Sequence, residues 1–294
     1  MRLPGLVLLA LGLGACGVPS AKTSSTPRLS VHIAESSRFA ALPVDLSQAL
    51  GFFRQQGIRL QQTSAHRASL TVGPIGGRWP VVGIVNRGLD GFVLGAVKDP
   101  GFRLTALNQV PVAYPKNDPA LALAFRALMR IHHVTDFLLE PLTPTHMLRL
   151  WQSGHLPYVV ANAALRYHLL RSDPQGVTLV VLSATTGPMP SLVVSGRSHV
   201  LPQFLAGLNL ALWYLETHTP QQVWSILPPR LRTAQSLSFI EEADRHHWFS
   251  PTTVPSHRDY DRARAFWQNV GVHWPTYYRA VDMQPSLIAL SLTP

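Results

Sequence analysis

The sequence predicts an α/β fold with parallel strands, and three features carry this prediction. Apolar residues alternate with polar ones in "RLSVHIA" at 28–34, a pattern typical of a strand. A helix-like segment at 36–56 and a short strand-like segment at 58–61 follow, and this β-α-β order favours a parallel sheet. A second unit begins at 109–115, where another strand-like segment leads into a helix-like segment at 118–133.

The helix-like segment of the first unit has clear start and stop signals. Ser36 or Ser37 is placed to cap its first turn, and Pro43 is tolerated in the first turns because an amide there has no helical partner. Gly57 is expected to end it. Apolar residues recur at helical spacing, at Ala41, Leu42, Leu46, Ala49, Leu50 and Phe53. We therefore expect one helix between the first two strands.

Further elements alternate along the rest of the chain. Segments 69–77, 80–85 and 91–100 are typical of buried strands, and Asp118 with Pro119 marks the start of a helix. Beyond them we expect a strand at 157–161 between two helices, and two strands within 176–196 around the turn "GPMP". The remainder is mostly helical, with apolar periodicity at 201–218 and 258–271.

The composition argues against nucleic-acid binding. The 294 residues carry 25 Lys and Arg against 15 Asp and Glu, a formal charge of +10, and 46% of them are hydrophobic. A nucleic-acid interface needs its basic residues on one stripe, whereas these are scattered, and the run at 258–264 is diluted by aspartates. The charge fits an anionic solute or life at low pH, where carboxylates gain protons.

The first residues are typical of an export signal. A basic Arg2, an apolar run at 3–13 and small residues before Cys16 predict a secretory signal over residues 1–16. The segment "LGAC" resembles the bacterial lipobox, which implies that Cys16 becomes an acylated N-terminus carrying lipid chains such as palmitate. Residues 17–27 are rich in Gly, Ser, Thr and Pro, which predicts a flexible tether. Cys16 is the only cysteine, so no disulfide forms within the chain.

Residues 30–61, "SVHIAESSRFAALPVDLSQALGFFRQQGIRLQ", resemble the opening of a family of solute-binding proteins. The family binds nitrate, taurine, aliphatic sulfonates and precursors of the thiamine pyrimidine. The triplet "GFF" at 51–53 is the most specific match, and weaker likenesses extend over most of 28–275. The resemblance implies a two-lobed periplasmic-binding-protein fold of type II, each lobe a mainly parallel sheet flanked by helices. It implies a first lobe at 28–108 and 195–294 and a second lobe at 109–194.

The resemblance also implies a function. We expect a monomeric lipoprotein on the outer face of the cell membrane, which captures a small molecule that can be an anion and delivers it to the permease of an ABC importer. No catalytic residue and no cofactor are expected. Two alternatives stay open: a lipoprotein of this fold that acts as a sensor or adhesin, and an enzyme related to the thiamine-pyrimidine synthases. Export argues against the enzyme, because that biosynthesis is cytosolic.

In such a fold the ligand lies at the carboxyl ends of strands and at helix N-termini, whose free amides suit anions. Four loops there supply candidate ligand-binding residues. The serines and Asn162 can instead be helix caps, and Arg38 and Lys116 can be surface charges. The candidates are Ser36, Ser37, Arg38, Gly73, Pro74, Lys116, Asn117 and Asn162.

Motifs for enzyme chemistry are missing from the sequence. It contains no Gly-x-Ser-x-Gly elbow, no Walker loop and no His-Glu-x-x-His motif. Adjacent histidines occur at 132–133 and 246–247, but neighbouring residues on a helix point about 100° apart. We therefore expect no metal site.

Overall fold

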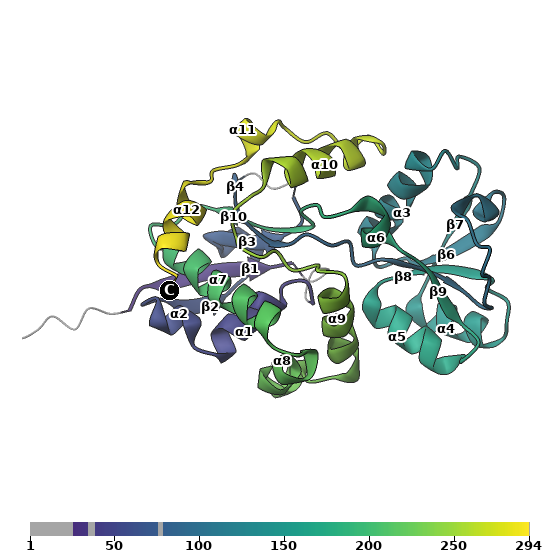
Figure 1. Cartoon of the computed structure of the whole chain (residues 1–294), viewed down its shortest axis with the longest axis horizontal. Coiled ribbons are helices and arrows are strands. Elements are labelled where there is room, and N and C mark those ends of the chain that lie inside the picture. The colour runs from purple at the N-terminus through teal and green to yellow at the C-terminus, as the bar shows by residue number, and fades with distance from the viewer. Residues whose placement is uncertain (1–25, 35–38, 76–78, 294) are drawn as a thin grey trace, which may run out of the picture.

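The computed structural model describes residues 26–34, 39–75 and 79–293 and arranges them as two α/β lobes, each with a five-stranded sheet (Figure 1). Cys16, residues 17–25 of the expected tether, and the candidates Ser36, Ser37 and Arg38 lie outside the described residues. The predicted α/β class is confirmed.

The first lobe contains the sheet formed by the strands at the start of the chain. Its strand order is β2-β1-β3-β10-β4, with β1 parallel to β2 and β3, and β10 antiparallel to β3 and β4. The strands are β1 (Arg28–Ile33), β2 (Arg59–Gln62), β3 (Leu70–Gly73), β4 (Val81–Asn86) and β10 (Leu192–Gly196). Its helices are α1 (Leu42–Ala49), α2 (Phe52–Gln55), α7 (Leu201–Thr217), α8 (Pro220–Ile226) and α12 (Gln284–Ser291).

The second lobe repeats this mixture of directions. Its strand order is β7-β6-β8-β5-β9, with β6 parallel to β7 and β8, and β5 antiparallel to β8 and β9. The strands are β5 (Phe92–Gly95), β6 (Pro111–Pro115), β7 (Leu138–Leu142), β8 (Tyr158–Ala161) and β9 (Val177–Val181). Its helices are α3 (Pro119–Ile131), α4 (Pro144–Gln152), α5 (Ala163–Ser172) and α6 (Leu182–Thr186).

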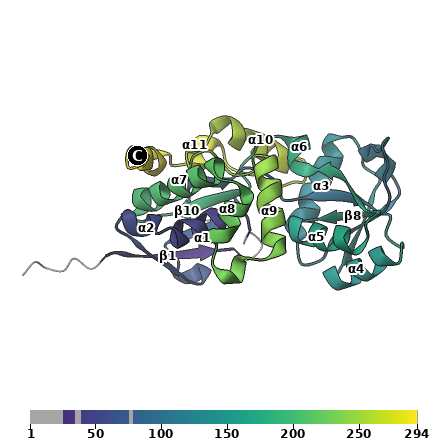
Figure 2. The same ribbon diagram turned by 60° about the horizontal axis from the view of Figure 1, so that its bottom comes forward.

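Two helices from the last third of the chain pack against the second lobe. Helix α9 (Ala234–Arg245) lies between α8 and α5, and Figure 2 shows it standing between the lobes. Helix α10 (His257–Gln268) packs against α3, where Ala263 and Phe266 join an apolar cluster with Phe125 and Leu128. The shorter elements are α11 (Tyr277–Ala280) and the 3₁₀ turns Ala65–Arg67, Leu104–Leu107 and Pro229–Leu231.

Two chain segments connect the sheets and are hydrogen-bonded to each other. One runs from β4 to β5 and the other from α6 to β10. The amides of Met189 and Ser191 donate to the carbonyls of Arg87 and Asn86, both at 2.9 Å. The Asn86 side chain accepts from the Ser191 hydroxyl at 2.9 Å. Paired crossings of this kind are where a two-lobed protein can hinge.

One expectation about the lobes is confirmed and another is corrected. Each sheet is mainly parallel, as expected: of its described strands only one, β10 in the first sheet and β5 in the second, runs antiparallel to its neighbours. Strand β5 lies in the second sheet, although we expected residues 28–108 in the first lobe. The other expected boundaries stay a prediction.

One expectation about the helices is also corrected. The helix expected across 36–56 is two helices, α1 and α2. Gly51 separates them with a φ of 75°, a left-handed conformation that glycine adopts without steric cost.

Candidate functional site

The candidate site is the edge of the second sheet where the parallel strands β6 and β8 end, together with the helices that begin there. We call it the helix-start edge; it comprises Asp90, residues 115–119 and residues 161–163. Lys116 and Asn117 follow β6 and are exposed, and the Lys116 amide donates to the Leu142 carbonyl at 2.8 Å. Asn162 follows β8 and precedes α5. Three of the predicted residues thus share one edge.

Asn162 and Asp118 cap the two helices that begin at this edge. The Asn162 side-chain oxygen accepts from the Leu165 amide at 3.0 Å, and Asp118 Oδ1 accepts from the Leu121 amide at 3.1 Å. The two caps also bind each other, since Asn162 Nδ2 donates to Asp118 Oδ2 at 3.1 Å. The structural role considered for Asn162, a helix cap, is therefore confirmed.

Asp90 is a third side chain that accepts a hydrogen bond from a helix-start amide at this edge, and the sequence analysis missed it. It precedes β5, and its Oδ1 accepts from the Ala163 amide, the first residue of α5, at 2.8 Å. Burial, with a smaller contribution from the nearby Asp118 charge, raises the pKa of the Asp90 carboxyl from 3.8 to about 7. The Ala163 hydrogen bond and the Arg166 charge act in the opposite direction.

Replacing Asp90 by Asn should change how stability depends on pH. The folded protein keeps a proton on Asp90 between the ordinary pKa of 3.8 and about 7, while the unfolded chain releases it. Burial of this carboxyl therefore costs stability progressively as pH rises through that window, by about 2–4 kcal/mol in all. Asn keeps an oxygen for the Ala163 amide without the charge, so the Asp90→Asn variant should exceed the wild type in unfolding free energy at pH 8 and match it near pH 4.

Urea denaturation at both pH values measures this difference, with Glu140→Gln, an exposed carboxylate of the same lobe, as the matched control. If Asp90→Asn differs from the wild type in unfolding free energy by the same amount at pH 4 and at pH 8, the Asp90 carboxyl is not buried as described.

Arg166 brings a positive charge near the edge, but its guanidinium already has protein partners. Its Nε donates to the Thr178 hydroxyl at 2.8 Å, and its Nη1 lies 3.2 Å from Glu242 Oε1. The guanidinium also lies over the Phe92 ring, 4.8 Å from the centroid. Its charge therefore serves the contact between α5 and α9.

The first lobe contributes the ends of β1 and β3. Gly73 is buried as the last residue of β3 and Pro74 is exposed directly after it. The residues after β1 lead to Phe39, whose ring stacks on Phe239 of α9 at 5.6 Å and belongs to the apolar cluster against the second sheet. In the described part of the chain no hydrogen bond joins Gly73 or Pro74 to Lys116, Asn117 or Asn162. Ligand contact at all these residues stays a prediction.

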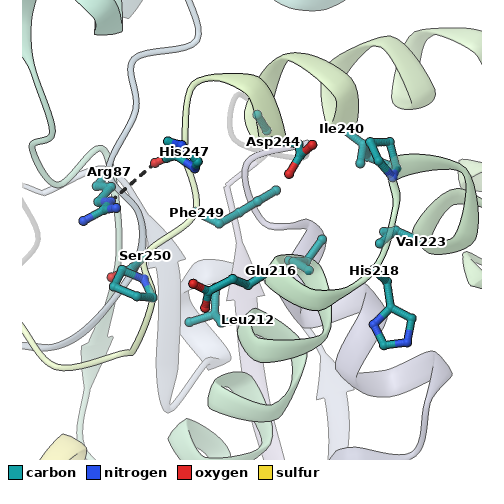
Figure 3. A pocket seen from close by; sticks show the side chains of 14 residues that line it. Arg87, Leu212, Glu216, His218, Val223, Ile240, Asp244, His247, Phe249 and Ser250 are labelled. Carbon is teal, nitrogen blue, oxygen red and sulfur yellow. Dashed lines mark hydrogen bonds between the residues drawn. The ribbon is translucent and has the colours of Figure 1, made fainter.

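A pocket of about 150 Å³ lies elsewhere, between α7, α8, α9 and residues 247–251 (Figure 3). Its wall combines apolar side chains with the carboxylates of Glu216 and Asp244, and at one side of it Arg87 Nε donates to the His247 carbonyl at 3.4 Å (Figure 3). Ligand pockets usually measure about 300–1,000 Å³, so this one is small. None of the predicted residues lines it. Its lining is Arg87, Leu212, Leu215, Glu216, His218, Pro220, Val223, Ile240, Ala243, Asp244, His247, Phe249, Ser250 and Pro251.

Within 26–34, 39–75 and 79–293, no three His, Cys, Asp or Glu side chains are grouped closely enough to hold a metal ion. Of the helices that the structure describes, none has both the length and the apolar character needed to cross a membrane.

Solved structures with the same fold include both binding proteins and an enzyme. No protein-family model and no curated protein sequence matches the chain. A putative periplasmic sulfonate-binding protein, SsuA of Methylobacillus flagellatus, is 12% identical with a TM-score of 0.65 over 90% of this chain and 94% of that one. The periplasmic aliphatic sulphonate binding protein SsuA of Escherichia coli is 15% identical with a TM-score of 0.61, over 89% and 92%.

The desulfurization enzyme DszB, in a mutant complex with biphenyl-2-sulfinic acid, is 11% identical with a TM-score of 0.66, over 91% and 99% of the two chains. This chain therefore shares a two-lobed fold that carries solute binding in some proteins and catalysis in another.

Proposed function

We propose that the protein is an extracytoplasmic solute-binding protein that holds a small molecule between its lobes and delivers it to an ABC importer. The observation that carries the proposal is the arrangement of two mixed sheets, joined by paired crossings, with strand ends and helix starts collected at one edge. Fold similarity to sulfonate-binding proteins over about nine-tenths of both chains supports it. The mechanism is closure about the crossings at 86–91 and 187–192.

Binding is tested by thermal-shift screening of the purified protein against sulfonates, nitrate, carboxylates, amines, amides and pyrimidines, with calorimetry on every hit. A true ligand should raise the midpoint of unfolding with its concentration. Asn117→Trp, which places a large ring at the helix-start edge, should weaken the hit, whereas Asn269→Trp at the end of α10 should not. Absence of any hit in all classes would contradict the proposal.

An enzyme is the second candidate, since DszB has the same fold. The missing catalytic motifs favour binding over catalysis. Prolonged incubation of the protein with a confirmed ligand, followed by mass spectrometry, separates the two. Recovery of the ligand unchanged supports a binding protein, and a new product identifies an enzyme.

We also propose that Cys16 carries the lipid anchor. In a bacterium that modifies lipoproteins, the full-length Cys16→Ser variant should leave the membrane fraction for the soluble fraction, or else stay unprocessed. Stable anchoring needs several acyl chains, and this variant lacks the residue that would carry them. Cell fractionation with mass spectrometry of the N-terminal peptide measures this. An unmodified Cys16 in the wild type would overturn the anchor.

A further inference from the structure

One end of the first sheet carries exposed positive charges that have no acidic partner. Strands β1 and β2 begin there with Arg28 and Arg59, which are partners in register on neighbouring strands whose backbones are about 4.8 Å apart. Arg197 follows β10, which ends there because it runs antiparallel to β3. All three arginines are exposed, and none of them forms an ion pair within the described residues. Neighbouring like charges destabilise a sheet, so an external anion would relieve this cost.

An indole ring lies beside these charges. Trp79, two residues before β4, is 46% exposed, and the Arg197 guanidinium lies over its ring, 5.7 Å from the centroid. The chain that leads into α12 is joined to the same end, because the Asp282 amide donates to the carbonyl of Val81, the first residue of β4, at 2.9 Å. We call this end of the lobe the strand-start edge; it comprises Arg28, Arg59, Trp79, Arg197 and the segment 283–292.

Helix α12 adds exposed apolar side chains to this edge. Its buried residues are Ser286 and Ala289, and the Ser286 hydroxyl donates to the Val82 carbonyl of β4. No residue of 283–293 carries a charged side chain. Apolar side chains combined with arginines and an indole suit the interface of a membrane, where indole rings favour the headgroup level. The exposed apolar side chains are those of Met283, Leu287, Ile288, Leu290 and Leu292.

The chain leads from the predicted lipid anchor directly to this edge. Cys16 lies twelve positions before Arg28, and a chain of that length reaches at most about 40 Å. Figures 1 and 2 both place the start of β1 and the C-terminus at the end of the first lobe that points away from the second lobe. In a protein anchored at Cys16, the strand-start edge is therefore held close to a lipid surface.

We infer that the strand-start edge docks on a lipid bilayer that contains anionic lipids. The arginines bind the headgroup phosphates, Trp79 lies at headgroup level, and the apolar side chains of α12 enter the interface. An acidic protein surface would also suit the arginines, but the link to the predicted anchor favours the lipid. This inference goes beyond the proposed solute binding and does not depend on it.

The contact is weak and reversible. Each arginine near an anionic bilayer raises the ratio of docked to undocked protein only about fivefold. The anchored protein can therefore leave the bilayer surface to meet its importer, and a protein without an anchor is not retained by this contact alone.

Hydroxyl-radical footprinting read by mass spectrometry tests the inference on the full-length protein, bound to the outside of preformed vesicles. The vesicles contain phosphatidylcholine alone or phosphatidylcholine with about one-third phosphatidylglycerol, which makes the surface anionic. Trp79 and Met283 should be oxidised at least about threefold more slowly on the anionic vesicles, because the bilayer covers them there. Trp213 is the internal control: it is 55% exposed and lies about 18 Å along α7 from Leu201, so its oxidation should not change.

Two double variants separate docking from a general effect of charge. Arg28→Gln with Arg59→Gln should lower the ratio of docked to undocked protein about 25-fold and so remove the protection of Trp79 and Met283. Arg126→Gln with Arg149→Gln is the matched control, since both arginines are exposed on helices of the second lobe, and it should keep the protection. Raising the salt concentration to about 0.5 M should also remove it in the wild type, because salt screens exposed charges.

Equal oxidation of Trp79 and Met283 on both kinds of vesicle would overturn the inference and leave an acidic protein as the occupant of this edge. Protection that survives Arg28→Gln with Arg59→Gln would overturn it as well. Protection that follows the protein-to-lipid ratio instead of the lipid charge would assign the edge to a second copy of the chain, which also contradicts the inference. All three outcomes leave the proposed solute binding standing, since the thermal-shift screen tests that separately.

Discussion

Trp248→Ala should lower the free energy of unfolding by about 3–5 kcal/mol, the largest effect that we expect from a single substitution in this protein. Trp248 is completely buried where four elements of the fold meet. Its Nε1 donates to the Ser183 hydroxyl of α6 at 2.6 Å, and its ring lies 5.8 Å from Phe92 of β5 and 5.6 Å from Phe239 of α9. Its carbonyl accepts from the Arg87 amide of the β4–β5 crossing at 2.7 Å.

Chemical denaturation measures this effect, and two further variants identify its cause. Trp248→Phe keeps most of the ring but loses the hydrogen bond to Ser183, so it should cost about 1–2 kcal/mol. Gly88 is close to the indole, since a Cβ there would lie 2.1 Å from Trp248 Cδ1. Gly88→Ala should therefore destabilise the wild type strongly and the Trp248→Ala variant much less. A loss below about 1 kcal/mol for Trp248→Ala would contradict the described packing of the crossing.

Glu242→Gln should destabilise the protein by about 3 kcal/mol, because it removes the charge from a buried carboxylate that faces two guanidinium groups and a histidine. Glu242 is 4% exposed. Its Oε1 faces Arg166 of α5 at 3.2 Å and Arg245 of its own helix at 2.5 Å, and its Oε2 faces His246 at 3.3 Å. The largest part of the loss comes from Arg166, whose side chain is only 16% exposed and would keep its charge without an anion.

A double-mutant cycle with Arg166→Gln measures the coupling between α5 and α9. The double variant should be more stable than the sum of the two single losses predicts, by about 1–3 kcal/mol. Arg245→Gln is the matched control: its side chain is 61% exposed, and its loss should cost less than about 1 kcal/mol. Additive losses for Glu242 and Arg166 would show that this ion pair does not link the two helices.

Local signals predicted much of the fold correctly. Asp118 was expected to cap a helix that starts with Pro119, and the structure places it there, because a cap depends on residues three positions apart. Strand β7 was missed, since "LLEPL" contains a proline and forms an edge strand with little apolar alternation. Strand β5 was expected in the first lobe because chain order does not reveal which sheet a strand joins; its partners are at 158–161 and 177–181.

The candidate site was predicted only in part, because chain order does not reveal which distant residues come together. Lys116, Asn117 and Asn162 follow strands, so their position at strand ends could be inferred from local patterns. Asp90 could not, because "GLDGF" is typical of a turn and its partner, Ala163, is 73 residues away. The small pocket is likewise assembled from several separate stretches of chain. Arrangements of this kind depend on tertiary packing, which a single sequence does not display.

Hydrogen exchange measured by mass spectrometry, with and without a ligand from the screen, tests most directly whether a small molecule is held between the lobes. A ligand seated there should slow exchange in peptides from both lobes: those after β3 at 73–75, and those at the helix starts of the second lobe at 115–121 and 161–166. Asn117→Trp should abolish that protection. Protection confined to 212–223 and 240–251, around the small pocket, or no protection with a ligand that binds, would contradict the account.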